Sequence, residues 1–145
     1  MTPTPGRRAD APPPIGADER RRRIDALRAA MERAKASAVL LGSTTSLRYF
    51  TGIDWHPSER FCGALISGAR IDYIAPRFEL EKVAGLVTLP GDIATWEEEE
   101  SPWRLIAGLA PAGALALDPD LPLFMYRALR REIDDARLAD AAPLI

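Results

Sequence analysis

The order of apolar segments along this sequence predicts an α/β fold with a mixed, mostly parallel sheet flanked by helices. Short apolar runs typical of buried strands alternate with segments in which apolar residues recur at helical spacing. Cys62–Ile66 and Ile71–Ala75 are separated by only four residues, which predicts an antiparallel hairpin. Strands joined through helices usually pair in parallel, so we expect the hairpin to supply the antiparallel pairing.

The composition is typical of a soluble domain. The 145 residues are 47% hydrophobic and 28% charged, which suits one compact unit. The net charge of −2 argues against general polyanion binding, although the first 35 residues carry nine Lys or Arg and five Asp or Glu. A single cysteine, Cys62, excludes an intrachain disulfide, and no apolar run is long enough for a membrane span or a secretory signal. We expect a cytoplasmic protein that binds neither nucleic acid nor membranes.

A proline-rich N-terminus precedes the predicted domain. Residues 1–17 have no periodic apolar face, so we expect a disordered tail that either has no function of its own or serves as a proline-rich ligand. A domain over residues 18–145 is expected to follow. From Asp18 to Lys35 the apolar residues recur every three or four positions, which predicts an amphipathic helix. Its expected inner face comprises Ile24, Leu27, Met31 and Ala34.

The next two elements are a strand and a short helix. We expect a buried strand at Ala38–Leu41, because this run is too short and too apolar for a surface helix and is bounded by Gly42. Ser43–Phe50 predicts a helical segment with hydroxyl groups suited to capping at its start and Gly52 at its end. The residues expected to pack behind it are Leu47, Tyr49 and Phe50.

The second half of the chain continues the alternation. Ser101 and Pro102 favour a helix start, since serine caps helices and proline is tolerated in the first turn. Helices are expected at Phe78–Val83, Trp103–Leu109 and Pro122–Ile133. Further strands are expected at Leu86–Leu89, Ile93–Trp96, Ala114–Leu117 and Arg137–Ala139. The expected inward-facing residues of the last helix include Phe124, Leu129 and Ile133.

Rare residues gather between positions 41 and 61, where we place the candidate site. This stretch contains the only histidine, His56, with Asp54 and Glu59 close by. A catalytic metal needs several ligands of suitable geometry, and three residues on one loop do not predict one. Glu97–Glu100 is rich in oxygen ligands but lacks the glycine turn and spaced ligands of a calcium loop. We therefore expect no metal site in this chain.

The sequence gives little support for nucleophilic catalysis or for nucleotide binding. Cys62 opens an apolar strand, where a cysteine is usually a small core residue, and no serine lies in a GxSxG motif. Gly42–Thr45 follows a buried strand and opens a helix, a position where backbone amides can bind an anion. This turn has one glycine and no lysine, so it matches neither a P-loop nor a dinucleotide-binding fingerprint. A nucleotide-binding domain therefore stays as the weakest alternative.

Taken in order, several segments resemble the N-terminal domain of creatinase, prolidase and aminopeptidase P type proteins. The most specific is the Tyr-Phe-Thr-Gly run at residues 49–52, soon after the first predicted strand. Pro76 at a strand-to-helix junction agrees with that family, as does Trp96 followed by an acidic loop and Pro102. The resemblance covers residues 18–145 and implies a ribonuclease-H-like α/β topology.

The resemblance implies an accessory role. In this family a second, "pita-bread" domain carries a divalent metal pair, of the Mn, Zn or Co type, and hydrolyses Xaa-Pro bonds. The chain would then be an isolated N-terminal domain without the catalytic domain, inactive alone, and no catalytic or metal-binding residue can be assigned in it. Its implied partners are its own C-terminal catalytic domain, a second copy in a homodimer and a proline-containing peptide substrate. The alternative is a self-contained, non-enzymatic binding or dimerisation module.

The family also implies that loops of this domain border the active site of the partner subunit. The loop after Gly52 matches such a loop by position. Arg60 suits a substrate carboxylate, and Trp55 or Phe61 suits the face of a proline ring. Alternatively, the two aromatic residues only pack the loop and Arg60 is a surface charge. The candidate substrate-rim residues are Asp54, Trp55, His56, Glu59, Arg60 and Phe61.

Overall fold

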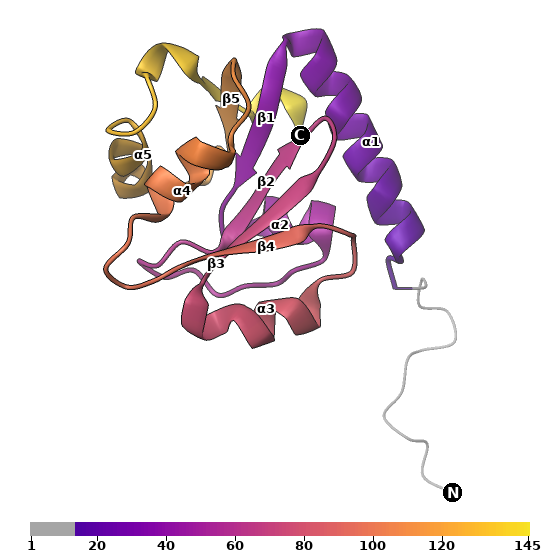
Figure 1. Cartoon of the computed structure of the whole chain (residues 1–145). Coiled ribbons are helices and arrows are strands. Elements are labelled where there is room, and N and C mark those ends of the chain that lie inside the picture. Colours follow the sequence, from indigo (N-terminus) through magenta and orange to yellow (C-terminus); the bar gives the residue numbers. More distant parts are fainter. Residues whose placement is uncertain (1–13) are drawn as a thin grey trace, which may run out of the picture.

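Within residues 14–145, which the computed structural model describes, six strands form one sheet with helices on both faces (Figure 1). Residues 1–13 of the predicted tail lie outside the described residues. The α-helices are α1 (Ala17–Ala34), α2 (Thr45–Thr51), α3 (Leu80–Leu86), α4 (Pro102–Leu109) and α5 (Leu123–Leu129). The strands are β1 (Ala36–Leu41), β2 (Gly63–Ser67), β3 (Ile71–Pro76), β4 (Asp92–Trp96), β5 (Ala114–Leu117) and β6 (Leu138–Asp140).

The sheet is mixed, in the order β4-β3-β2-β1-β5-β6. β2 pairs antiparallel with both β1 and β3, and the β2–β3 connection is the predicted hairpin. The pairs β3–β4, β1–β5 and β5–β6 are parallel. Each parallel pair is connected through at least one helix, as crossover geometry requires. The predicted mixed, mostly parallel sheet is therefore confirmed.

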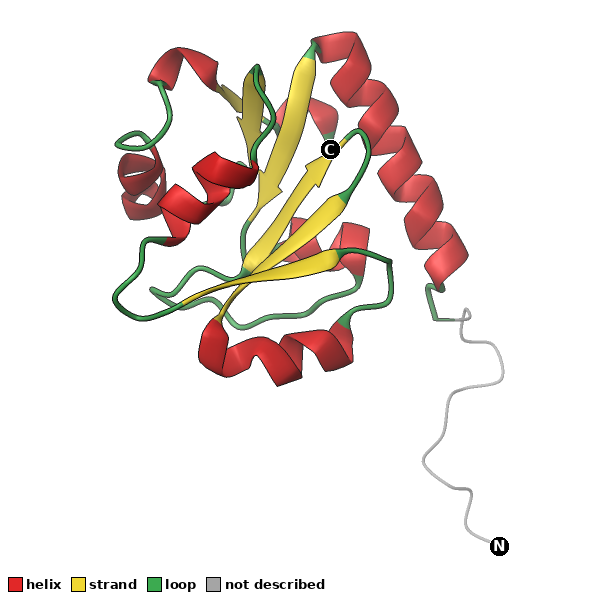
Figure 2. Ribbon diagram, viewed as in Figure 1, coloured by secondary structure: helices red, strands yellow, loops and turns green. Residues whose placement is uncertain are grey.

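Side chains of the central strands alternate between two cores, one on each face of the sheet. Val39 and Leu41 of β1 pack with α1 and α2. Ala38 and Leu40 point to the opposite face and pack with α4 and α5. Figure 2 shows α1 on one side of the sheet and the α4–α5 pair on the other. A strand covered on both faces must be apolar throughout, which explains the uninterrupted AVLL run.

Helix α1 closes one face of the sheet. Ile24, Leu27 and Met31 are buried, as the helical spacing predicts. Ala34 is exposed, contrary to expectation, because it is the last residue of the helix and Lys35 turns the chain in the left-handed region at φ 60°. Although α1 has 18 residues, no helix among residues 14–145 is both long and apolar enough to cross a membrane.

The predicted strand at Leu86–Leu89 is wrong. Leu86 is the last residue of α3, and the following residues form the connection to β4. Leu89 is nevertheless buried in the core beside α1. The apolar character of this run therefore comes from packing of a connection, and strand pairing resumes only at Asp92, opposite Asp72.

Two aromatic residues expected in the core are exposed. Phe124 is 52% exposed, and Met125 is the α5 residue that enters the core in its place. Tyr49 is 48% exposed, and its ring lies under the Arg23 guanidinium, 4.0 Å from the ring centroid. The predicted helix at residues 122–133 is also shorter, since α5 ends at Leu129. Leu129 and Ile133 are buried as expected.

Candidate functional site

A hollow of about 440 Å³ opens beside the carboxyl ends of β1 and β5. These strands are parallel neighbours, so both of their carboxyl ends lie at the same edge of the sheet. From this edge the chain continues into α2 on one face and into α5 on the other. The hollow therefore lies at a topological switch point, the place where open α/β sheets commonly bind ligands.

Asp118, the residue directly after β5, joins the two strand ends. Its side chain is 2% exposed, and Oδ2 accepts hydrogen bonds from the Gly42 N–H at 3.2 Å and from the Thr44 hydroxyl. Oδ1 accepts from the Asp120 N–H at 2.9 Å. A buried carboxylate with three donors fixes the chain leaving β1 against the chain leaving β5. Sequence reasoning missed it, although an acidic residue directly after a buried strand was an available signal.

Two hydroxyl groups anchor the start of α2 at the rim of the hollow. Thr44 is the N-cap, and its Oγ1 accepts from the Leu47 N–H at 3.5 Å, which confirms the predicted capping. Ser43 Oγ donates to the Cys62 carbonyl at 2.7 Å. Gly52 follows the last helical residue at φ 80°, so the predicted glycine end is confirmed. The polar edge of the hollow is thus held by local hydrogen bonds.

The six predicted rim residues divide into two groups. Asp54, Trp55 and Phe61 line the hollow. Trp55 is half-buried, and the Lys82 ammonium lies 4.8 Å from its ring centroid. Phe61 is only 1% exposed and packs edge-on against Trp103, with ring centroids 5.2 Å apart. Phe61 is therefore first of all a core residue at the floor of the hollow.

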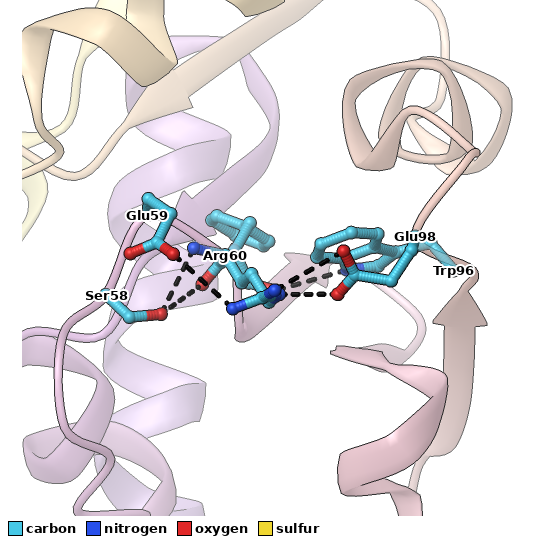
Figure 3. A network of polar contacts seen from close by, with 6 residues as sticks. Ser58, Glu59, Arg60, Trp96 and Glu98 are labelled. Carbon is cyan, nitrogen blue, oxygen red and sulfur yellow. Dashed lines mark hydrogen bonds and ion pairs between the residues drawn. The ribbon is translucent and has the colours of Figure 1, made fainter.

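Arg60 is not among the residues that line the hollow, and its side chain reaches the acidic segment after β4 (Figure 3). Its Nε and Nη2 donate to the two Glu98 carboxylate oxygens at 2.5 and 3.3 Å, and Nη1 lies 3.4 Å from Glu59. Hydrogen bonding to Glu98 raises the pKa of Arg60, and the same bond lowers the pKa of Glu98. Both groups are solvent-exposed, so the pair positions the loop more than it stabilises the fold.

The same loop is tied to the sheet edge by its backbone. The Trp96 indole Nε1 donates to the Phe61 carbonyl at 3.1 Å, and the Arg60 N–H donates to Ser58 Oγ at 3.1 Å (Figure 3). The first bond connects the predicted site loop to the end of β4, and the second bond lies within the loop. Sequence reasoning noted both segments but could not show that they meet.

The two remaining candidates, His56 and Glu59, are exposed and do not line the hollow. Within residues 14–145 no three His, Cys, Asp or Glu side chains are grouped so that they could hold a metal ion. The described side chains therefore could not hold the metal pair, which the family resemblance implies for the second domain. The hollow instead combines hydroxyl groups, one guanidinium and carboxylates with an apolar floor.

Cys62 is buried directly before β2, and burial raises the pKa of its thiol to about 12. A thiol that is neutral and enclosed is a poor nucleophile. This agrees with its interpretation as a small core residue.

We therefore expect Cys62 in the folded chain to react with Ellman's reagent near pH 8 at least about a hundredfold more slowly than in the urea-unfolded chain. The absorbance of the released thionitrobenzoate measures both rates. A Ser58→Cys variant, which adds a thiol on the exposed loop, provides the control and should show one additional fast phase. Equal rates in folded and unfolded protein would show that Cys62 is accessible.

The topology and the hollow define a mixed-sheet α/β domain with an open hollow at its switch point. Residues 23–145 match the family model described as the Creatinase/Prolidase N-terminal domain, and the chain belongs to this family. An uncharacterized peptidase from Schizosaccharomyces pombe is 30% identical over 128 residues. That match covers 78% of this chain, and the chain spans 28% of the length of the relative.

Solved structures agree on the fold. The dipeptidase PepE from Mycobacterium ulcerans matches with a TM-score of 0.72 and 22% identity, covering 86% of this chain and 35% of that one. A prolidase from Thermococcus sibiricus matches with a TM-score of 0.75 and 19% identity, and the match covers 90% of this chain and 36% of that one. The N-terminal domain of an Xaa-Pro dipeptidase from Streptococcus pyogenes matches with a TM-score of 0.69 and 17% identity. This match covers 84% of this chain and 95% of that one. The predicted family and its α/β fold are therefore confirmed.

Proposed function

We propose that this chain is the N-terminal accessory domain of a metal-dependent Xaa-Pro peptidase, inactive alone. The observation that carries the proposal is the family match over residues 23–145. It is supported by the lengths of the relatives, because the chain corresponds to about a third of the M. ulcerans dipeptidase and to 95% of the separate S. pyogenes domain. In this proposal the metal pair and its Asp, His and Glu ligands belong to a catalytic domain outside these 145 residues.

The accessory role has two parts, dimerisation and bordering of the partner subunit's active site. We assign the second part to the loop of residues 54–61. Asp54 and Trp55 are the members best suited to it, because both line the hollow and neither is fully buried. Arg60 could meet a substrate carboxylate only by breaking its ion pair with Glu98. Phe61 is buried, so it could contact a proline ring only at the floor of the hollow. We also propose a cytoplasmic location, consistent with a single cysteine whose thiol is free.

A self-contained binding module is the second candidate, and the hollow at the switch point favours it. The nucleotide alternative has less support. At the Gly42–Thr45 turn, the Gly42 N–H and the Thr44 hydroxyl both donate to the Asp118 carboxylate. A phosphate at this turn would have to compete with a buried carboxylate for those donors.

Hydrolysis of leucyl-proline and glycyl-proline tests the peptidase proposal. With Mn²⁺, Zn²⁺ or Co²⁺ added, the 145-residue chain should show no hydrolysis, because it supplies no metal-activated water. The same chain, continued by the reading frame that follows Ile145, should hydrolyse both dipeptides and lose the activity in EDTA. Light scattering of the longer protein should give a dimer.

Two results contradict the proposal. One is a following reading frame that encodes no set of Asp, His and Glu metal ligands. The other is metal-dependent hydrolysis by the 145-residue chain itself. If the longer protein is active as a monomer, only the dimerisation part of the proposal is contradicted.

A further inference from the structure

The hollow between α2, α5 and the loop of residues 54–61 has the size and character of a ligand site in its own right. Its volume of about 440 Å³ lies in the range of small-molecule pockets. Its walls come from segments far apart in the sequence, with Thr44 and Arg48 on one side and Asp120 and Met125 on the other. The Asp118 carboxylate ties the Gly42–Thr44 segment to Asp120, so these two edges of the hollow are joined before a ligand arrives.

Charges of both signs line this hollow. Arg48 is exposed and has a single ion pair in the described residues, with Asp54 at 4.0 Å, the outer limit for such a contact. Most of its five N–H donors are therefore available. Asp120 lines the hollow and is exposed, and its carboxylate forms no ion pair within residues 14–145. Its backbone N–H donates to Asp118. The site thus offers a cation for a carboxylate and a carboxylate for an ammonium group.

Apolar side chains also line the hollow. The Phe61 ring packs edge-on against Trp103, and the Phe61 carbonyl accepts a hydrogen bond from the Trp96 indole. Met125 is buried beside it, and Trp55 forms a half-buried wall. A side chain seated here would gain apolar contact without reorganising the core, because the floor residues are already packed.

We propose that this hollow binds a small zwitterion with an apolar side chain, either a free amino acid or a short peptide. Its ammonium group pairs with Asp120, its carboxylate pairs with Arg48, and its side chain packs on Phe61, Met125 and Trp55. The inference does not depend on the peptidase proposal, because it needs neither a metal ion nor a second domain.

Calorimetric titration of the 145-residue chain in metal-free buffer tests this site. The probes are L-leucine, L-leucyl-L-proline and N-acetyl-L-leucine, which lacks the ammonium charge. We expect saturable binding of leucine or the dipeptide and binding at least about tenfold weaker for the acetylated probe, since a charge-assisted hydrogen bond is lost. Binding of leucine identifies a free amino acid as sufficient, whereas binding of the dipeptide alone identifies a peptide.

Two variants locate the binding. Asp120→Asn and Arg48→Gln should each weaken binding at least about tenfold, whereas the exposed controls Glu99→Gln and Arg127→Gln should leave it unchanged. Circular dichroism melting checks that each variant folds. If a variant does not fold, the comparison of leucine with N-acetyl-leucine on the unchanged chain still tests the pairing of the ammonium group. The proposal is overturned if neither leucine nor the dipeptide binds up to about 10 mM. It is also overturned if binding is insensitive both to acetylation and to the change at Asp120.

Discussion

Replacement of Gly63 by alanine should lower the free energy of unfolding by about 3 kcal/mol or prevent folding. Gly63 begins β2, and the next residue, Ala64, pairs with Leu41 at the end of β1. A Cβ atom at this position would lie 2.0 Å from the Leu41 carbonyl oxygen and 2.9 Å from the Phe61 ring. The oxygen belongs to the backbone of a central strand, so it cannot move without disturbing the sheet. Urea unfolding followed by circular dichroism measures the loss.

The same substitution at Gly85 is the matched control. Gly85 lies in α3, and a Cβ there would meet nothing within 4 Å. Alanine has the higher helix propensity, so Gly85→Ala should raise stability by up to about 1 kcal/mol. If the free energy of unfolding falls for Gly63→Ala and rises for Gly85→Ala, the Gly63 effect is due to the close contact with the Leu41 carbonyl oxygen. A Gly63→Ala protein as stable as the parent would show that β1 and β2 can separate without cost.

Asp118→Ala should cost about 2 to 4 kcal/mol, a large effect for a residue outside the hydrophobic core. The substitution leaves three donors without their acceptor, namely the Gly42 N–H, the Thr44 hydroxyl and the Asp120 N–H. Leaving a buried donor unsatisfied costs about 1 to 3 kcal/mol, and partial access of water to this edge reduces the sum. Urea unfolding again provides the measurement.

Two further variants, Asp118→Asn and Asp25→Ala, separate the loss of the buried hydrogen bonds from the general effect of removing an acidic side chain. Asparagine keeps the shape and one acceptor oxygen, so its loss should be smaller than that of alanine. Asp25 is exposed on α1, and its replacement should change stability by no more than about 0.5 kcal/mol. If Asp118→Ala were as mild as Asp25→Ala, the hydrogen bonds at the strand ends would not hold the hollow together.

The sequence predicted the architecture well because its periodicity reflects burial. The uninterrupted apolar run that ends at Leu41 indicated a strand covered on both faces, and β1 is the strand with α1 and α2 on one side and α4 and α5 on the other. The same logic failed at Leu86–Leu89. A connection packed on the core carries the same apolar residues as a strand, and only the pairing partners distinguish the two.

The candidate site was predicted less completely. Asp54 and Trp55 were named and do line the hollow, whereas Arg60 was named and points to Glu98 instead. Asp118 and Asp120 were not considered, because in sequence they lie more than 50 residues beyond the loop. Their importance depends on β5 lying next to β1, which no local pattern indicates.

The sequence by itself therefore determined the alternation of helices and strands, the mixed sheet and the family, because these depend on local periodicity and short segments. Only the tertiary structure decided which residues meet at the carboxyl ends of β1 and β5. The order of strands in a sheet depends on contacts between distant segments, and the hollow, its charges and its apolar floor are products of that order.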